Sequence, residues 1–252
     1  ISECDWSSDV CSSDLDNEVI KSVIFDYGGT LDTNARHWAH VLWDGFQAVK
    51  VPVTEAQFRE AYVFGERALA KAPIINSDDD FYALLCKKVR QELLWLDFKE
   101  YFITTKSERL QLSQRIATFC NDYVLQQLLQ TRSVLEELQK KYRLVLVSNF
   151  YGNIETILRS YQLEYFSAII ESAVVGVRKP DPRIYQLGVD ACCCKASEVC
   201  VVGDSFSKDI LPASSVGCQT IWLKGKGWTD KEEDESIPNA VVTDLKDLLQ
   251  YL

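Results

Sequence analysis

The feature that most constrains the fold is a series of short apolar runs, rich in β-branched residues, that alternate with helical patterns. The runs are VIKSVIFD (Val19–Asp26), YRLVLVSN (Tyr142–Asn149), FSAIIES (Phe166–Ser172), SEVCVVGD (Ser197–Asp204) and CQTIWL (Cys218–Leu223). Nearly continuous apolar runs of this length are typical of strands covered on both faces, as in a parallel sheet. Helical patterns lie between them at Thr131–Lys141, Asn153–Leu163, Pro182–Cys192 and Ser207–Gly217. The alternation predicts an α/β fold with a doubly wound, Rossmann-like parallel sheet.

A long interval without a convincing strand separates the first run from the second. Helical patterns fill it, at Arg36–Lys50, Thr54–Lys71, Asp78–Leu96 and from Lys106 to about Leu129. Thr54 with Gln57 three residues later resembles a capping box, and Ser77 before three aspartates resembles another helix start. We therefore predict an all-helical cap, including its return to the core, over residues 34–129. The α/β core would comprise residues 16–33 and 130–252.

The first fifteen residues need a separate interpretation. ISECDWSSDVCSSDL has neither the basic start nor the apolar run of a signal peptide. It matches what one reading frame of a common sequencing adapter encodes, and a disordered tail rich in serine and aspartate is the alternative. Both interpretations exclude this segment from the fold, and the natural start is left open.

Composition narrows the classes of partner. The net charge of −10 argues against nucleic acid or an anionic membrane as the main partner. There is also no run of 18 apolar residues to span a bilayer.

Seven cysteines remain after residue 15, an odd number without a secretory signal, which indicates reduced thiols and a cytoplasmic protein. The triplet Cys192–Cys194 lacks paired C-x-x-C spacing, so we interpret it as structural. The sequence contains only two histidines, His37 and His40, so it offers few candidates for the histidine of a serine–histidine triad.

Unusual polar residues follow the ends of the predicted strands. Asp26 ends the first strand, Ser148 and Asn149 the second, and Asp204 a later one. The carboxyl ends of parallel strands meet at one edge of a sheet, where ligands bind. Each residue alone has an ordinary explanation, such as a helix cap for Asp26. Ordinary structural roles do not readily explain why all of these polar residues occur at strand ends together with Lys179, which lies in a proline turn.

Phosphoryl transfer is the chemistry that this set of groups can share. The Asp26 carboxylate can attack phosphorus to form an aspartyl-phosphate. The hydroxyl of Ser148 and the ammonium of Lys179 can hold the phosphoryl oxygens as charge develops. Carboxylates that converge at Asp26, Asp204 and Asp209 repel one another unless a cation lies among them, and oxygen ligands favour Mg²⁺.

The chain resembles the haloacid dehalogenase superfamily of aspartate-nucleophile hydrolases, in the phosphatase-like branch whose helical cap follows the first motif. FDYGGTL matches the first motif, LVLVSN the second, RKPDP with Lys179 the third, and VVGDSFSKD the fourth. The resemblance extends from Val19 nearly to the C-terminus. It implies a Mg²⁺-dependent hydrolase with Asp26 as nucleophile, acting on a small phosphorylated metabolite.

The resemblance also implies roles for individual residues. The metal would be bound by Asp26, the backbone carbonyl of Gly28 and Asp204, with Asp209 nearby in support. We further predict that Gly29, Thr30 and Asn149 contact the substrate.

One position departs from the phosphatase pattern. The residue two after the nucleophile is normally a second aspartate, the general acid–base, and here it is Gly28. The enzyme could act on phosphates whose leaving group needs little protonation, or Asp32, His37 or Tyr27 could supply the proton. A non-catalytic phosphate- or partner-binding protein is a further alternative. A 2-haloacid dehalogenase ranks lower, because Tyr27 lies one place earlier than the tyrosine of that branch.

The predicted start of the cap holds candidates for substrate recognition. Arg36 could meet a second anionic group, and Trp38 and Trp43 could stack on a ring, although amphipathic packing favours a structural role for both tryptophans. His37 is equally consistent with packing and with a place near the site.

Overall fold

The computed structural model describes residues 19–227 and 232–252. The segment 1–15, interpreted above as an artefact or a tail, lies outside these residues. The strands are β1 (Ser22–Phe25), β2 (Arg143–Ser148), β3 (Ala168–Glu171), β4 (Val199–Gly203), β5 (Gln219–Leu223) and β6 (Ala240–Val242). The helices are α1 (Trp38–Ala48), α2 (Glu55–Lys71), α3 (Phe81–Phe98), α4 (Lys106–Leu138), α5 (Ile154–Ser160), α6 (Ser172–Val175), α7 (Arg183–Cys192) and α8 (Leu211–Ser215). Short helical turns are η1 (Ala196–Glu198), η2 (Phe206–Ile210) and η3 (Leu245–Gln250).

The strands form one sheet in the order β3-β2-β1-β4-β5-β6. Every neighbouring pair is parallel. The predicted doubly wound α/β fold is therefore confirmed. The sequence analysis missed β6, which adds three residues beside β5.

Alternating residues of the central strands enter separate cores on the two faces of the sheet. On β1, Val23 and Phe25 join the core that includes α4 and α5, whereas Ile24 joins the core that includes α7 and α8. All three side chains are fully buried. This burial on both faces explains why the strand reads as a continuous apolar run.

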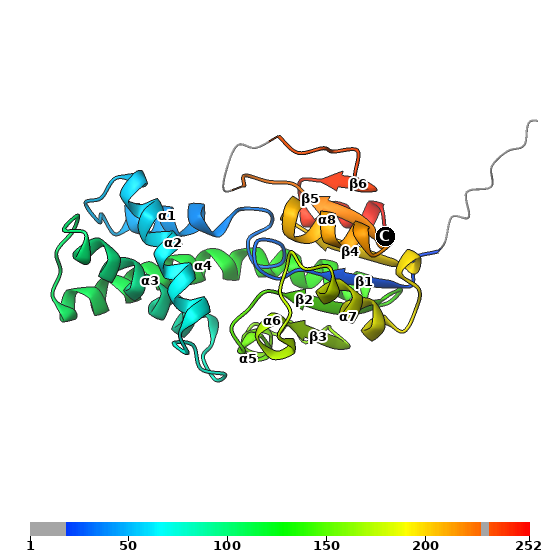
Figure 1. Cartoon of the computed structure of the whole chain (residues 1–252), viewed down its shortest axis with the longest axis horizontal. Helices are drawn as coiled ribbons and strands as arrows, with labels where there is room; N and C mark the ends of the chain where they lie inside the picture. The colour runs from blue at the N-terminus through cyan, green and yellow to red at the C-terminus, as the bar shows by residue number, and fades with distance from the viewer. Residues whose placement is uncertain (1–18, 228–231) are drawn as a thin grey trace, which may run out of the picture.

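Helices α1 to α4 fill the interval between β1 and β2, and the structure shows no strand from Asp26 to Tyr142. Figure 1 shows these helices grouped beside one end of the sheet, with α4 running from that group back beneath the strands. The predicted capping box is confirmed, since Thr54 and Gln57 bond reciprocally at the start of α2.

Two predicted helix boundaries were wrong. The patterns Lys106–Leu129 and Thr131–Lys141 belong to the single helix α4. Thr131 does not start a helix, because its buried hydroxyl donates to the carbonyl of Leu31 at 2.7 Å. Likewise α3 starts at Phe81 and not after Ser77, since Asp80 is the residue that accepts from the amide of Ala83. The cap boundary at residue 129 falls inside α4 and stays a prediction.

The remaining sequence-based expectations concern thiols and membranes. The seven cysteines of the described part of the chain form no disulfide, and Cys192 is buried at the end of α7. No helix in residues 19–227 or 232–252 combines the length and apolar character needed to cross a bilayer.

Candidate active site

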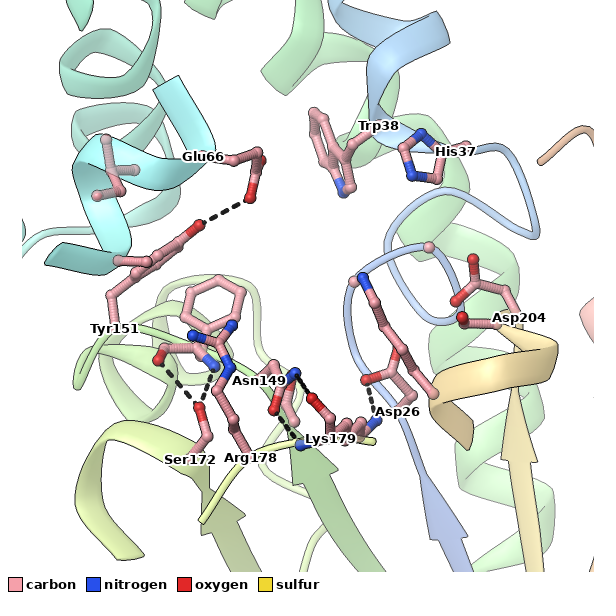
Figure 2. Close-up of a pocket in the computed structure, with 18 of the residues that line it drawn as sticks. Asp26, His37, Trp38, Glu66, Asn149, Tyr151, Ser172, Arg178, Lys179 and Asp204 are labelled. Atoms are coloured by element: carbon pink, nitrogen blue, oxygen red, sulfur yellow. Dashed lines mark hydrogen bonds and ion pairs between the residues drawn. The ribbon is translucent and has the colours of Figure 1, made fainter. Parts of the chain in front are cut away.

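The strand ends that carry the predicted residues meet at one edge of the sheet. Phe25 pairs with Leu146 of β2 and with Val202 of β4, so the residues that follow these strands lie side by side. Together they line a cavity of about 1290 Å³ that also includes residues of α2 and α3. Figure 2 shows Asp26, Asn149, Lys179 and Asp204 on the sheet side of this cavity, with His37, Trp38 and Glu66 opposite. The predicted residues Gly28, Gly29, Ser148 and Asp209 also line it.

A buried ion pair lies at the base of the cavity. The Lys179 ammonium is 2.6 Å from Oδ1 of Asp26 and 2.7 Å from Oδ1 of Asp209. All three side chains are at least nine-tenths buried. Burial lowers the pKa of Lys179, but the two carboxylates outweigh it and hold the pKa above its ordinary value. Lys179 therefore carries its charge beside Asp26, the predicted nucleophile, where a positive charge could stabilise developing negative charge.

Asp209 accepts hydrogen bonds from two other groups besides Lys179. The Tyr185 hydroxyl donates to its Oδ1 at 2.7 Å, and the amide of Ser205 donates to its Oδ2 at 2.9 Å. Each carboxylate oxygen thus already accepts a protein hydrogen bond. The observed contacts orient Asp209 as a support for Lys179, and direct metal binding by Asp209 stays a prediction.

Asp26 and Asp204 are linked through Thr30. The Thr30 hydroxyl is 3.3 Å from Oδ2 of Asp26 and 3.3 Å from Oδ1 of Asp204, and it accepts from the amide of Asp204 at 3.0 Å. Thr30 is fully buried and is not among the residues that line the cavity. It therefore positions the two acids, and its contact with substrate stays a prediction.

Asn149 also makes a different contact from the predicted one. Its side-chain amide donates to the carbonyl of Lys179 at 3.1 Å and accepts from the amide of Lys179 at 2.8 Å. These two bonds fix the backbone of Lys179. Binding of substrate by Asn149 stays a prediction, whereas its positioning of Lys179 is observed.

The acidic cluster is suited to a divalent cation. Carboxylate oxygens of Asp26, Asp204 and Asp209 lie within 4.8 Å of one another. Burial raises the pKa of Asp26 to about 6 despite Lys179. Burial, followed by repulsion from Asp209 and Asp26, raises the pKa of Asp204 well above its ordinary value. Buried carboxylates that repel one another are stabilised by a cation with a preference for oxygen ligands, so these residues fit Mg²⁺.

Gly29 has a conformation and a close contact that require glycine. Its φ is +96°, and a Cβ atom built there would lie 2.4 Å from Oδ2 of Asp204. Its amide donates to Asp32 at 2.7 Å. The Asp204 carboxylate therefore packs directly on the Gly29 backbone, which leaves no room for a side chain.

We expect Gly29→Ala to lower the free energy of unfolding by about 1–3 kcal/mol for the backbone strain, with a further loss from the displaced carboxylate. Gly152→Ala is the matched control, because Gly152 has a φ of +93° but no atom within 4 Å of its Cβ position. Urea unfolding of both variants separates the two effects, because Gly152→Ala reports the backbone strain alone and Gly29→Ala reports the strain together with the clash against Asp204. Equal losses would show that Asp204 moves aside without cost.

Two of the residues near Gly28 that could supply a proton, Tyr27 and Asp32, are buried. Tyr27 is fully buried against Phe81 and Phe150 and does not line the cavity. Asp32 is fully buried and accepts hydrogen bonds from the amide of Gly29 at 2.7 Å and from Nε1 of Trp38 at 2.8 Å. Both of its carboxylate oxygens thus accept hydrogen bonds, while burial raises the pKa of Asp32 to about 7, and Asp32 also lines the cavity.

His37 lines the cavity but also caps α1. Its Nδ1 accepts from the amide of Ala39 at 3.1 Å, which assigns the ring proton to Nε2. Burial lowers the pKa of His37 to about 4. The ring is therefore neutral at pH 7 and lacks an extra proton to transfer.

The other candidates in the predicted start of the cap have structural contacts. Arg36 pairs with Asp44 at 2.6 Å and is not among the residues that line the cavity, so its contact with a second anionic group stays a prediction. Trp43 packs on Phe58 and is also outside the cavity, as the packing interpretation expected. Trp38 does line the cavity while donating to Asp32.

Sequence reasoning missed the residues that face Asp26 across the cavity. Glu66 of α2 pairs with Lys88 of α3 and accepts from the Tyr151 hydroxyl at 3.3 Å. Burial raises the pKa of Glu66, but the Lys88 ammonium outweighs it and holds the pKa below its ordinary value. Glu66 lies in mid-helix without any motif, so only the fold reveals its place.

Comparisons with known proteins agree with this architecture. The model of the haloacid dehalogenase-like hydrolases matches residues 20–217. A HAD-hydrolase, YfnB from Bacillus subtilis, whose structure is described as bound to magnesium, superposes with a TM-score of 0.58 at 19% identity, covering 93% of this chain and 99% of that one. A dehalogenase described with an intermediate complex gives a TM-score of 0.64, also at 19% identity, covering 93% and 98%. At these identities the superpositions show the fold.

Curated relatives match over shorter stretches. Glyceraldehyde 3-phosphate phosphatase of Pyrococcus furiosus is 33% identical over 99 residues, 39% of this chain and 41% of that protein. Haloacid dehalogenase-like hydrolase domain-containing protein 3 of Mus musculus is 32% identical over 112 residues, 44% and 45% of the two chains. Phosphoserine phosphatase of Thermus thermophilus is 32% identical over 84 residues, 33% of each chain. The chain thus spans less than half the length of these relatives. With its parallel sheet, its acidic cluster and a family match over most of its length, the chain belongs to the haloacid dehalogenase-like hydrolases.

Proposed function

We propose that the protein is a Mg²⁺-dependent phosphatase that hydrolyses a small phosphomonoester through an aspartyl-phosphate at Asp26. The observation that carries the proposal is the Asp26 carboxylate, which lines the cavity and is bound by the buried ammonium of Lys179 at 2.6 Å. The family assignment and the similarity to two phosphatases support the same chemistry.

The first step belongs to Asp26 and Lys179. With a pKa of about 6, Asp26 is a carboxylate at neutral pH, the form that attacks phosphorus. A carboxylate oxygen forms the new bond to phosphorus while the bond from phosphorus to the leaving oxygen breaks. Lys179 and the buried Ser148 at the end of β2 would hold the phosphoryl oxygens as charge develops. Water then attacks the aspartyl-phosphate, which releases phosphate and restores Asp26.

A divalent cation would be held by Asp26, Asp204 and the carbonyl of Gly28. When bound, it would neutralise the carboxylates and polarise the phosphoryl group. Asp209 would hold Lys179 in place, and Thr30 would fix Asp26 and Asp204 relative to each other.

Gly28 limits the leaving groups that the site can expel. A positioned general acid contributes about 10²–10⁴ in rate. The nearest side chains are held in other contacts, since both oxygens of Asp32 accept hydrogen bonds and the neutral His37 caps α1. We therefore propose that the substrate is a phosphate with a leaving group that needs little protonation, such as an acyl or aryl phosphate.

The test is phosphate release from acetyl phosphate and from propyl phosphate, with and without Mg²⁺, in wild type and Asp26→Asn. We expect Mg²⁺-dependent release from acetyl phosphate and little from propyl phosphate. Asp26→Asn should reduce release to background, because the amide cannot attack phosphorus. Equal release from both esters would show that another group supplies the proton. No release from either would contradict the proposal and favour a binding protein.

A further inference from the structure

The cavity beyond the reaction centre has a charge opposite to that of the whole chain. Outside the cluster of Asp26, Lys179, Asp204 and Asp209, its lining contains more basic than acidic side chains. The basic ones are Arg67, Lys71, Lys88, Arg178, Lys208 and Lys224, and the acidic ones are Asp32, Glu66 and Glu233. The chain as a whole carries a net charge of −10. A cationic lining in an acidic protein favours an anionic ligand larger than phosphate alone.

Two of these cations are fixed beside the reaction centre. Arg178 directly precedes Lys179, and Lys208 directly precedes Asp209. Since the side chains of Lys179 and Asp209 are joined at 2.7 Å, this ion pair anchors the backbone on both sides of the centre. Asn149 adds a second anchor by accepting from the amide of Lys179 at 2.8 Å.

Neither cation has a protein carboxylate within 4 Å among residues 19–227 and 232–252. Lys88 and Lys224, by contrast, pair with Glu66 and Glu235. Arg178 and Lys208 are therefore available to a ligand in a way that Lys88 and Lys224 are not.

Both cations also face the cap side of the cavity. The Lys208 charge lowers the pKa of His37 in addition to burial and Lys88, and it lowers the pKa of Glu66 together with Lys88, against burial. The Arg178 charge acts on Tyr151 in the same way, against the larger effect of burial. Figure 2 shows the Arg178 side chain extending from the sheet side toward Tyr151.

We infer that Arg178 and Lys208 form a second anion subsite, so that the natural substrate is a small phosphate ester whose leaving part carries a carboxylate or a second phosphate. The inference rests on the proposed phosphatase function and extends it to a substrate class. A guanidinium binds either anion through two parallel hydrogen bonds, and Lys208 adds a point charge.

The experiment compares two aryl phosphates that differ in charge alone. 4-Carboxyphenyl phosphate carries the second anion, and 4-carbamoylphenyl phosphate has the same shape without it. 1,4-Phenylene bisphosphate is added as the phosphate form of the second anion. We expect kcat/KM of wild type to be at least about tenfold higher for an anionic ester than for the carboxamide, as charge-assisted hydrogen bonds imply. Preference for one anionic ester over the other identifies the anion.

The variants assign this preference to the subsite. Arg178→Ala should reduce the ratio between anionic and neutral ester to about 1–3, whereas Arg178→Lys should retain part of it because the charge remains. Arg159→Ala is the matched control, since Arg159 is exposed on α5 and does not line the cavity. Its ratio should equal that of wild type. A wild-type ratio near 1, or a ratio unchanged in Arg178→Ala, would overturn the inference.

Binding measurements keep this result separate from the proposed function. Dissociation constants of the same esters are measured by calorimetry with Asp26→Asn in Mg²⁺, which needs no turnover. Loss of turnover for every ester would reject the phosphatase proposal, while the ratio of dissociation constants would still decide the subsite. We expect this ratio to favour the anionic esters and to fall when Arg178→Ala is combined with Asp26→Asn.

Discussion

Gly28→Asp is expected to raise hydrolysis of propyl phosphate by about 10²–10⁴-fold, the typical contribution of a positioned general acid–base. The backbone at Gly28 has no positive φ, and no atom lies within 4 Å of the Cβ position. Because Gly28 lines the cavity two residues after Asp26, an added carboxyl group would have room to extend into the cavity near Asp26, where the proposed reaction takes place. The measurement is kcat/KM for propyl phosphate relative to acetyl phosphate, whose leaving group needs no proton.

Gly28→Asn is the matched control, because its amide fills the same space and has no proton to transfer at neutral pH. Its kcat/KM for propyl phosphate should stay near that of wild type. An equal gain in both variants would mean that space filling, and not proton transfer, limits the reaction. Assays need saturating Mg²⁺, since a fourth carboxylate adds to the repulsion among Asp26, Asp204 and Asp209.

The sheet was predictable because its strands are buried on both faces and therefore read as apolar runs. The exact boundaries of the strands were less predictable. Val19–Asp26 shortens to Ser22–Phe25, because pairing with both neighbouring strands is confined to those four residues. The strand β6 was missed because only three residues, Ala240–Val242, pair with β5, and so short a run has no visible period.

The site was predictable where topology alone brings residues together. Asp26, Ser148 and Asp204 follow adjacent parallel strands, so their proximity is a consequence of the sheet order. The turn with Lys179 follows no strand of its own, and its contact with Asp26 depends on the bonds from Asn149.

The contacts of individual side chains were harder to predict wherever several polar groups lay within reach of the same side chain. Arg36 lies near Asp26 in sequence, yet it pairs with Asp44 of α1 and is not among the residues that line the cavity. Thr30 belongs to the motif, yet it lies behind the carboxylates. Proximity in sequence does not specify which face of a loop a side chain occupies.

The second large effect is expected at Glu92, a buried acid of the helical region between β1 and β2. Glu92 lies on α3 and is fully buried, and neither carboxylate oxygen has a hydrogen-bond partner in the part of the chain that the structure describes. Helix α2 packs tightly over it, since a Cβ atom at Gly65 would be 2.9 Å from Cγ of Glu92. Burial raises the pKa of Glu92 from 4.5 to about 8, with Lys88 lowering it and Glu66 raising it.

The sign of the pH dependence follows from this raised pKa. Between pH 4.5 and about 8, the folded protein keeps a proton on Glu92 that the unfolded chain has lost. This acid therefore makes the free energy of unfolding fall as pH rises through that window, by about 1.4 kcal/mol per pH unit. Above pH 8 the loss is complete, because the buried carboxylate is then charged in the folded protein as well.

Glu92→Gln removes the titrating group and preserves its shape. We expect the variant to match wild type near pH 4 and to exceed its free energy of unfolding by about 4–5 kcal/mol at pH 8.5. Urea unfolding at several pH values measures the difference, and Glu137→Gln, at an exposed position on α4, is the control that should follow wild type throughout. Parallel curves for Glu92→Gln and wild type would show that Glu92 does not titrate between the folded and unfolded states as its burial implies. A divergence that begins near pH 4.5 and ends near pH 8 would identify this one carboxyl group as the cause, because the window is bounded by its two pKa values.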